Sequence, residues 1–300
     1  MALVVIAGPT GTGKSEIAVR LAEKTGGEII NYDSIQLYRG FDLGSAKPPA
    51  EVRRRVPHHL FDVLDADAEF NAAEYARLAR PLIEKIARPI LAGGTFFYLR
   101  AVLAGLPEMP ARDPAIRARL RHIASARGGP DRLRRWLTRV DPKSGSSIAS
   151  GDRHRVERAL EVLIVSGQPI SAWQRPTAMA EEIPAIKIAL MLERQQLVKS
   201  LDARVEAMYR SGLIEETRQL LQRYPPTARP FHAIGYREAA AVISGRLTES
   251  AAIAETRRRT RAYAKRQVTW LRAERNVHWV DAADRDAAFA ATVRLVEGES

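Results

Sequence analysis

The segment from Gly8 to Ser15, GPTGTGKS, constrains the fold more than any other feature, because it matches the pattern G-x-x-x-x-G-K-[S/T]. A short apolar run, 3–7, precedes it, and helical apolar spacing follows it. In this context backbone N–H groups turn inward around phosphate oxygens, and the lysine adds a positive charge. We therefore predict a phosphate site formed by Gly8, Pro9, Thr10, Gly11, Thr12, Gly13, Lys14 and Ser15, with Ser15 as the ligand of Mg²⁺.

Alternating strand and helix patterns predict an α/β fold with a P-loop NTPase-like parallel sheet core. Further strands are expected at 28–32, 89–92, 186–192 and 277–280, and 41–65 is expected to form a loop. Residues 112–158 differ from this strand-and-helix pattern, because they have helical apolar spacing and carry thirteen Lys or Arg against five Asp or Glu. We predict a core domain of 1–111 and 185–300 with C-terminal helices, interrupted by an all-helical insertion domain at 112–184.

The composition restricts the partners and the location of the chain. Lys and Arg number 47 against 35 Asp and Glu, a net charge of +12 that favours a polyanionic partner. The absence of cysteine excludes disulfides and Cys-ligated zinc. No apolar run reaches the roughly 18 residues of a membrane span, and no secretory signal is visible. We expect a cytoplasmic monomer that uses no membrane and no obligate protein partner.

Asp33 and Thr95 are the candidate catalytic residues, because each follows a predicted strand next to the phosphate loop. An NTPase has an Asp at the end of a second strand to hold Mg²⁺, whereas strand 89–92 ends in Gly93-Gly94-Thr95. The ends of adjacent parallel strands share one crevice, so both side chains should face the phosphate loop. The residues alone leave Asp33 open as a metal ligand or as a general base.

Eight segments taken together resemble the bacterial tRNA dimethylallyltransferases (tRNA isopentenyltransferases). They occur in the family's order over nearly the whole chain: 8–15, 33–38, 44–48, 57–60, 93–95, 152–162, 233–238 and 264–272. The phosphate loop alone is unspecific, but the ordered set is highly specific. The resemblance implies transfer of a dimethylallyl group from dimethylallyl diphosphate to N6 of the adenosine 3′ of the anticodon.

The same resemblance implies roles for individual residues. The phosphate loop and Arg204 would bind the diphosphate with Mg²⁺, Asp33 would be the general base, and Thr95 would contact the target nucleotide. The partner would be the tRNA anticodon stem-loop, consistent with basic residues gathered at 112–158 and 255–275. The implied tRNA contacts are Asp33, Ser34, Ile35, Gln36, Thr95, Arg117, Asp152, Arg153, His154, Arg155, Val156, Gly235, Tyr236, Arg237, Lys265, Arg266, Gln267, Trp270 and Arg272.

Two other functions are compatible with a phosphate loop. The first is a small-molecule kinase that uses ATP under a helical lid, and the basic surplus and the missing acidic strand end argue against it. The second is an RNA-binding module with an inactive loop, and the intact Lys14, Ser15 and Asp33 argue against it.

Overall fold

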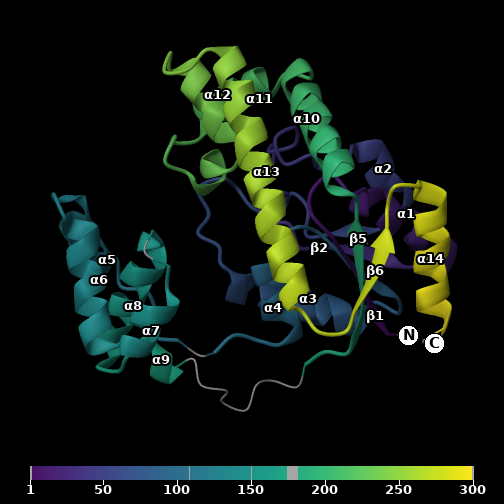
Figure 1. Cartoon of the computed structure of the whole chain (residues 1–300). Coiled ribbons are helices and arrows are strands. Elements are labelled where there is room, and N and C mark those ends of the chain that lie inside the picture. Colours follow the sequence, from purple (N-terminus) through teal and green to yellow (C-terminus); the bar gives the residue numbers. More distant parts are fainter. Residues whose placement is uncertain (1, 108, 150, 174–181, 299–300) are drawn as a thin grey trace. The chain divides into compact units, whose positions relative to one another are not determined.

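The computed structural model describes residues 2–107, 109–149, 151–173 and 182–298, which form two compact units (Figure 1). The first unit takes the described residues within 1–104 and 182–300, and the second those within 105–181. We propose that these units are the core and insertion domains anticipated from the sequence. Part of the anticipated insertion, 174–181, lies outside the described residues.

A parallel sheet forms the centre of the first unit, which confirms the predicted fold class. Its strands are β1 (Leu3–Ala7), β2 (Glu28–Asn31), β3 (His58–His59), β4 (Pro89–Ala92), β5 (Ala185–Met191) and β6 (Val277–Asp281). Within the described residues their order is β3-β2-β4-β1-β5-β6, and every neighbouring pair is parallel. Because β1 and β2 both pair with β4, the loops that follow these three strands emerge together at one edge of the sheet.

The prediction that 41–65 is a loop was partly wrong. This segment contains α2 (Ala50–Arg55) and the two-residue strand β3. The strand exists because His58 and His59 pair with Ile29 and Ile30 of β2. A strand this short depends on its partner strand and has no periodicity of its own, so pattern analysis could not detect it.

Helices pack on the sheet and extend above it in the first unit. They are α1 (Lys14–Thr25), α3 (Ala72–Lys85), α4 (Phe96–Leu103), α10 (Arg194–Arg210), α11 (Leu213–Arg223), the 3₁₀ turn η1 (Arg229–His232), α12 (Tyr236–Ile243), α13 (Glu249–Ala273) and α14 (Arg285–Gly298). Val4 and Ile6 of β1 share one core cluster with Ile17 and Leu21 of α1 and Val293 of α14. Each buried aliphatic side chain of this kind contributes roughly 1.5–3 kcal/mol, so this cluster holds the start of α1, and with it the phosphate loop, against the sheet.

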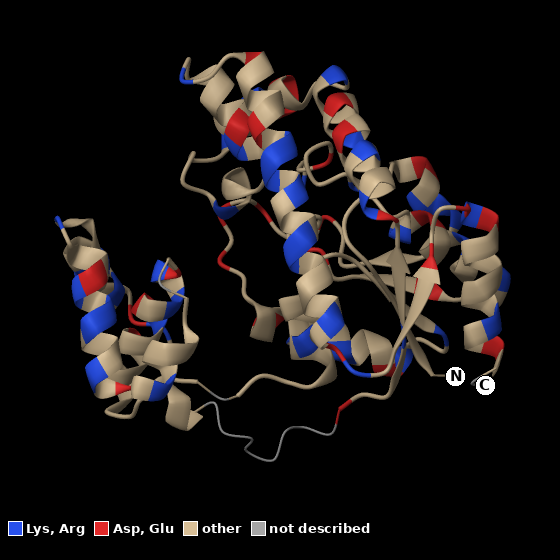
Figure 2. Cartoon of the chain, in the orientation of Figure 1, with Lys and Arg blue, Asp and Glu red and all other residues tan. Residues whose placement is uncertain are grey.

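The second unit is all-helical within its described residues. It contains α5 (Pro114–Ser125), α6 (Gly129–Val140), α7 (Pro142–Ser147), α8 (Arg153–Ser166) and α9 (Ile170–Trp173) around a core that includes Leu120, Leu133 and Leu160. Lys and Arg predominate among its charged residues (Figure 2). Across the described residues of both units, no helix is long and apolar enough to span a bilayer.

Candidate active site

The phosphate loop between β1 and α1 has a backbone that requires glycine. Gly8 has a φ of +144°, and a Cβ there would lie 2.5 Å from the carbonyl oxygen of Leu190. Gly13 has a φ of +82°, and its Cβ would lie 2.4 Å from the guanidinium of Arg285. That guanidinium donates a 2.5 Å hydrogen bond to the carbonyl oxygen of Thr12. The loop is therefore fixed by its own glycines and by a side chain from α14.

A cavity of about 900 Å³ opens beside this loop in the first unit. The loops after β1, β2 and β4 line it, together with residues of α1, α2, α10 and α13. Its lining includes Thr10, Gly11, Gly13, Lys14, Ser15, Asp33, Ser34, Ile35, Gln36, Gly93, Gly94, Thr95, Arg204, Arg266 and Gln267. The structure thus brings Asp33 and Thr95 to the phosphate loop, as expected for adjacent strand ends. Arg204, which lies 171 positions after Asp33 in the sequence, lines the same cavity.

Local hydrogen bonds orient the Asp33 carboxylate. Asn31 Oδ1 accepts from the Asp33 backbone N–H at 2.8 Å, and Asp33 Oδ1 accepts from the Ile35 N–H at 2.9 Å. The other oxygen, Oδ2, lies beside Gly94, where a Cβ would come within 3.2 Å of it. Asp33 therefore has one oxygen tied to its own turn, while the second lies beside a residue without a side chain.

The charged groups of the cavity perturb one another. Burial raises the pKa of Asp33, against the opposing effects of backbone N–H donors and of Lys14 and Arg204. Burial and the neighbouring Arg204 lower the pKa of Lys14 to about 7, and Asp33 partly opposes this shift. Burial also lowers the pKa of Arg204, while Asp33 raises it. Two cations and one carboxylate therefore share a poorly solvated space, an arrangement that favours binding of an anion.

Thr95 joins the ends of β2 and β4. Its Oγ1 accepts a hydrogen bond of 3.0 Å from the Ser34 backbone N–H and lies 3.2 Å from Ser34 Oγ. Its own N–H donates to the carbonyl oxygen of Tyr32 at 3.3 Å. Thr95 is thus bonded on both sides of Asp33, to the residue before it and to the residue after it.

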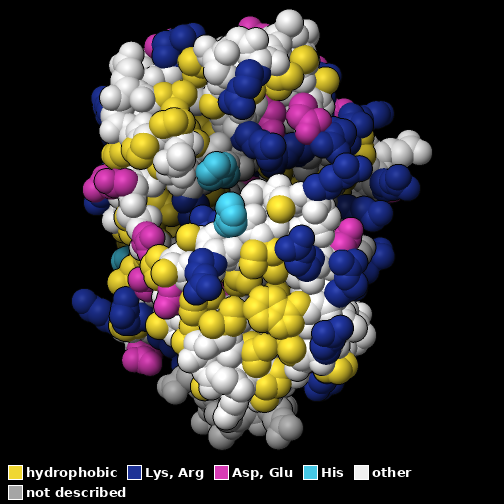
Figure 3. Space-filling model, turned by 90° about the vertical axis from the view of Figure 1, so that its left-hand side faces the viewer, with side chains coloured by type: hydrophobic (Ala, Val, Ile, Leu, Met, Phe, Trp, Pro, Cys, Tyr) yellow, Lys and Arg dark blue, Asp and Glu magenta, His cyan; other side chains and the backbone are white. Residues whose placement is uncertain are grey.

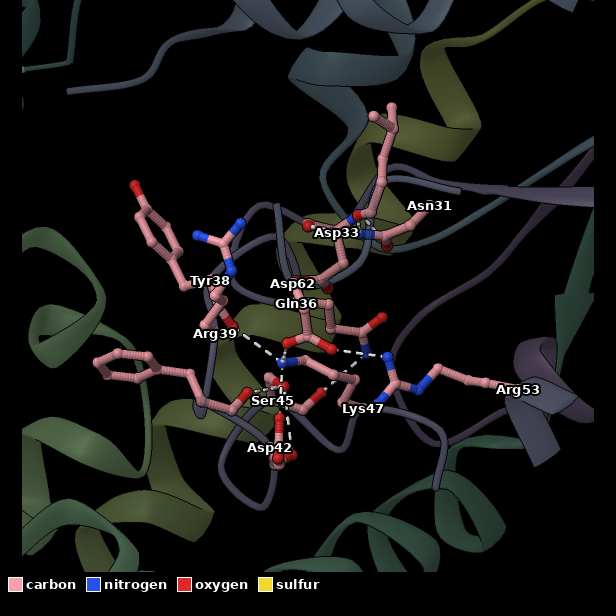
Figure 4. A network of polar contacts seen from close by, with 12 residues as sticks. Asn31, Asp33, Gln36, Tyr38, Arg39, Asp42, Ser45, Lys47, Arg53 and Asp62 are labelled. Atoms are coloured by element: carbon pink, nitrogen blue, oxygen red, sulfur yellow. Dashed lines mark hydrogen bonds and ion pairs between the residues drawn. The ribbon is translucent and has the colours of Figure 1, made fainter. Parts of the chain in front are cut away.

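A buried lysine, Lys47, organises the loop that forms another wall of the cavity (Figure 4). Its Nζ donates to Tyr38 O at 2.8 Å, to Asp42 Oδ1 at 2.6 Å and to Asp62 Oδ1 at 2.5 Å. Arg53 Nη1 donates to the other oxygen of Asp62 at 2.6 Å. Sequence reasoning missed this role because the partners lie on three separate turns, and neither spacing nor composition brings them together.

Gln36 and Tyr236, two of the expected tRNA contacts, support the same loop from inside. Gln36 Nε2 donates to Ser45 O at 3.0 Å. Tyr236 is fully buried, donates from its hydroxyl to Glu216 Oε1 at 2.6 Å and accepts from Gly44 N at 3.1 Å. Tyr236 therefore shapes the cavity wall from the protein interior.

The neighbours of Tyr236 begin α12. Gly235 has a φ of +94° and precedes the first residue of the helix, while Arg237 is exposed in its first turn. Of these three expected tRNA contacts, Arg237 is therefore the one that presents a charged side chain to solvent.

Lys and Arg recur along the helix α13 (Figure 2), and their pairing divides it into two parts. Its first arginines pair with carboxylates: Arg257 with Glu206, Arg258 with Glu255, Arg259 with Glu238 and Arg261 with Asp202. Farther along, Lys265, Arg266 and Arg272 are exposed, and within the described residues no ion pair engages them. Trp270 is partly buried between them. Lys and Arg side chains are also prominent on the surface drawn in Figure 3.

The expected tRNA contacts of the second unit have differing environments. Asp152 caps α8, accepting from the Arg155 N–H at 3.1 Å, and Val156 is buried in the helical core. Arg153, His154 and Arg155 are exposed. Arg153 donates to Ala124 O at 3.1 Å, and Arg155 pairs with Asp152 at 3.2 Å. A sixth position, Arg117 on α5, lies 3.9 Å from the buried carboxylate of Glu161.

The lining offers few ligands for a metal ion. Across the described residues there is no group of three or more His, Asp or Glu side chains that could hold one. The adjacent His58 and His59 have separate partners, Val56 O at 2.8 Å and Glu28 Oε2 at 2.6 Å. Ser15 and Asp33 both line the cavity. Since Mg²⁺ keeps several waters and often binds through substrate phosphates, these residues fit Mg²⁺ that arrives with a diphosphate.

Comparison with known proteins identifies the family. The model of the IPP transferase family matches residues 36–274. The tRNA dimethylallyltransferase of Solibacter usitatus is 45% identical, covering 93% of this chain and 92% of that protein, and the one of Geobacter sulfurreducens is 42% identical over 93% and 91%.

Solved structures agree with these relatives. The full-length tRNA isopentenylpyrophosphate transferase of Bacillus halodurans superposes with a TM-score of 0.73 at 35% identity, covering 99% of this chain and 96% of that one. A eukaryotic dimethylallyltransferase acting on tRNA gives 0.82 at 26% identity, covering 100% and 79%. The chain belongs to the IPP transferase family.

Proposed function

We propose that this protein transfers the dimethylallyl group of dimethylallyl diphosphate to N6 of the adenosine 3′ of the anticodon in tRNA. The observation that carries the proposal is the single cavity in which the phosphate loop, Arg204, Asp33 and Thr95 meet. The printed names of the relatives, tRNA dimethylallyltransferases at 40–45% identity, support it. The strongly basic chain and its proposed tRNA partner are consistent with activity in the cytoplasm.

The diphosphate is the leaving group, and its charge must be stabilised as the bond to the allylic carbon breaks. Backbone N–H groups of the loop, the positive end of α1 and the cations Lys14 and Arg204 are available for this. Mg²⁺, held by Ser15 together with diphosphate oxygens, would supply further positive charge on the leaving group. We assign the phosphate loop to diphosphate binding, because β4 is followed by Gly93-Gly94-Thr95 and not by the acidic residue of an NTPase.

The attacking N6 amine must lose a proton, and we assign Asp33 as the base that accepts it. Burial raises the pKa of this carboxylate, which strengthens it as a base, and Lys14 and Arg204 partly oppose that rise. Thr95, bonded to the backbone on both sides of Asp33, holds the carboxylate in place and lines the space for the adenine.

The adenosine must leave the stacked loop to reach a cavity of this kind. The backbone phosphates of the tRNA need cations outside the cavity, and the exposed Lys265 and Arg272 of α13 and Arg237 of α12 can supply them. Arg266 of α13 is exposed as well and lines the cavity. In the second unit we keep the exposed His154 and Arg155 as phosphate contacts, with Asp152 capping their helix.

Incubation of the protein with tRNA and labelled dimethylallyl diphosphate tests the proposal, followed by nuclease digestion to locate the label. The expected result is label on the adenosine next to the anticodon. ATP turnover on a metabolite would instead support a kinase, and tight tRNA binding without transfer would support an inactive RNA-binding module.

A further inference from the structure

Gln267 of α13 is buried at the centre of the site, with both ends of its amide engaged. Only 2% of the residue is exposed. Its Oε1 accepts from the backbone N–H of Thr10 at 2.9 Å, and its Nε2 donates to the carbonyl oxygen of Gly94 at 2.9 Å. One side chain thus connects the phosphate loop after β1 with the turn after β4.

The Gly94 end of this bridge lies against the catalytic carboxylate. A Cβ on Gly94 would come within 2.9 Å of Gln267 Nε2 and within 3.2 Å of Asp33 Oδ2. The hydroxyl of Tyr263, also on α13, donates to the same carbonyl oxygen at 2.9 Å. Gly94 is therefore held from one side by α13, and it sets the space left for Asp33 on the other.

The Thr10 end of the bridge affects the donor site. Backbone N–H groups of such a loop ordinarily point at phosphate oxygens. The N–H of Thr10 instead donates to Gln267, which leaves the donor diphosphate to the N–H groups farther along the loop and to Lys14. The amide thus fixes where the diphosphate sits relative to α13.

We propose that Gln267 is a positioning residue, which sets the separation between the donor diphosphate on the phosphate loop and Asp33 beside Gly94. The inference rests on the proposed function, and it removes Gln267 from the set of expected tRNA contacts. Transfer requires the reacting atoms in near-attack geometry, and a displacement of about 1 Å costs roughly 100-fold in rate. Loss of the bridge should therefore act on the chemical step.

The variant Gln267→Met tests this, because it keeps the side-chain volume and removes both hydrogen bonds. We expect kcat to fall by about 10- to 100-fold, with the Kd for tRNA unchanged within twofold. The matched control is Gln219→Met on α11, the same replacement at an exposed glutamine whose Nε2 donates to Glu215 Oε1 at 3.3 Å, outside the site. It should leave both kcat and the Kd for tRNA unchanged.

A second variant, Gln267→Glu, keeps the test decisive if Gln267→Met lowers stability in a thermal melt. A protonated carboxyl group offers one donor and one acceptor, as the amide does, whereas a carboxylate offers acceptors alone. The ratio of the kcat of Gln267→Glu to that of wild type should therefore rise as pH falls. The same ratio for Gln267→Met should not change with pH.

Three outcomes would overturn the proposal: a wild-type kcat in Gln267→Met, weakened tRNA binding with kcat retained, or a pH-independent ratio for Gln267→Glu. Failure of the proposed function is distinguishable from these, because then the wild-type protein itself transfers no label.

Discussion

The backbone N–H of Ser34 donates a 3.0 Å hydrogen bond to Thr95 Oγ1, although the two residues are 61 positions apart. Ser34 directly follows Asp33, and Thr95 follows the Gly93-Gly94 turn of β4. The bond exists because β2 and β4 are neighbours in the parallel sheet. It ties the backbone of the proposed base to the strand end that lines the proposed adenine space.

Replacement of Thr95 by Val keeps the shape of this residue and removes its hydroxyl. The Ser34 N–H then loses its acceptor, at a cost of about 1–3 kcal/mol. We expect kcat/KM for tRNA to fall by roughly 5- to 150-fold, in proportion to that cost. Thr95→Ser retains the hydroxyl and should stay within a few-fold of wild type. Steady-state transfer kinetics of both variants check this, and equal activities in the two would contradict it.

Lys14 should take up a proton when a diphosphate binds. Burial and Arg204 lower its pKa to about 7 in the free protein, so at pH 8 it is mostly neutral. A bound anion raises that pKa again, and we expect uptake of up to about one proton per site. Isothermal titration calorimetry with dimethylallyl diphosphate at pH 8, in buffers of different ionisation enthalpy, measures the number of protons taken up per site.

Lys14→Met provides the control for this measurement, because it removes the titrating amine and keeps most of the side-chain length. Binding to this variant should be weaker and should take up less proton. An uptake equal to that of wild type would place the proton on another group.

Lys47 should contribute more to stability than an exposed lysine. Its amine is buried against Asp62, Asp42 and Tyr38 O. Lys47→Met removes all three bonds and leaves Asp62 with Arg53 alone among these cations, at a cost of about 3 kcal/mol. The control Lys24→Met breaks a surface pair with Glu297 at 3.7 Å and should cost below about 1 kcal/mol. Urea unfolding at pH 7 measures both.

The effect of Lys47→Met should depend on pH. Burial raises the pKa of Asp62, but Lys47 and Arg53 outweigh this and hold it below its usual value. A depressed carboxylate pKa stabilises the fold above the unfolded pKa, and that stabilisation is lost as pH falls through the folded pKa. The difference in the free energy of unfolding between wild type and Lys47→Met should therefore become smaller as pH falls. A difference that grows in acid would contradict the stabilising role of the Lys47–Asp62 pair.

Lys265 should bind tRNA through phosphate alone. It is exposed on α13, so Lys265→Ala should weaken binding of all tRNAs similarly and reduce the slope of log K against log salt by about 1. Arg258→Ala is a suitable comparison, since Arg258 is already paired with Glu255 and its removal should have a smaller effect. Filter binding across a salt series separates the two variants, and an unchanged slope for Lys265→Ala would be the contrary result.

Features that depend on local sequence were predictable. The phosphate loop is encoded in consecutive residues, and the apolar runs at 3–7 and 89–92 became β1 and β4. The meeting of Asp33 and Thr95 followed from one rule about strand ends. Lys47 and Gln267 were not recognised as organising residues, because their partners are distant in the chain and sequence periodicity carries no information on such contacts. Val156 and Tyr236 were expected among the tRNA contacts and are buried. Sequence motifs do not show which of their residues face the protein interior.

The central claim is that Asp33 accepts the N6 proton during transfer from the loop-bound diphosphate. Asp33→Asn keeps the size of the side chain and its bond from Ile35 N, and it removes the base. Single-turnover transfer measured across a Mg²⁺ titration tests the claim most directly. We predict that both substrates still bind and that the rate falls by about 10²–10⁴ at every Mg²⁺ concentration. Recovery of the rate at high Mg²⁺ would contradict the claim and make Asp33 a metal ligand.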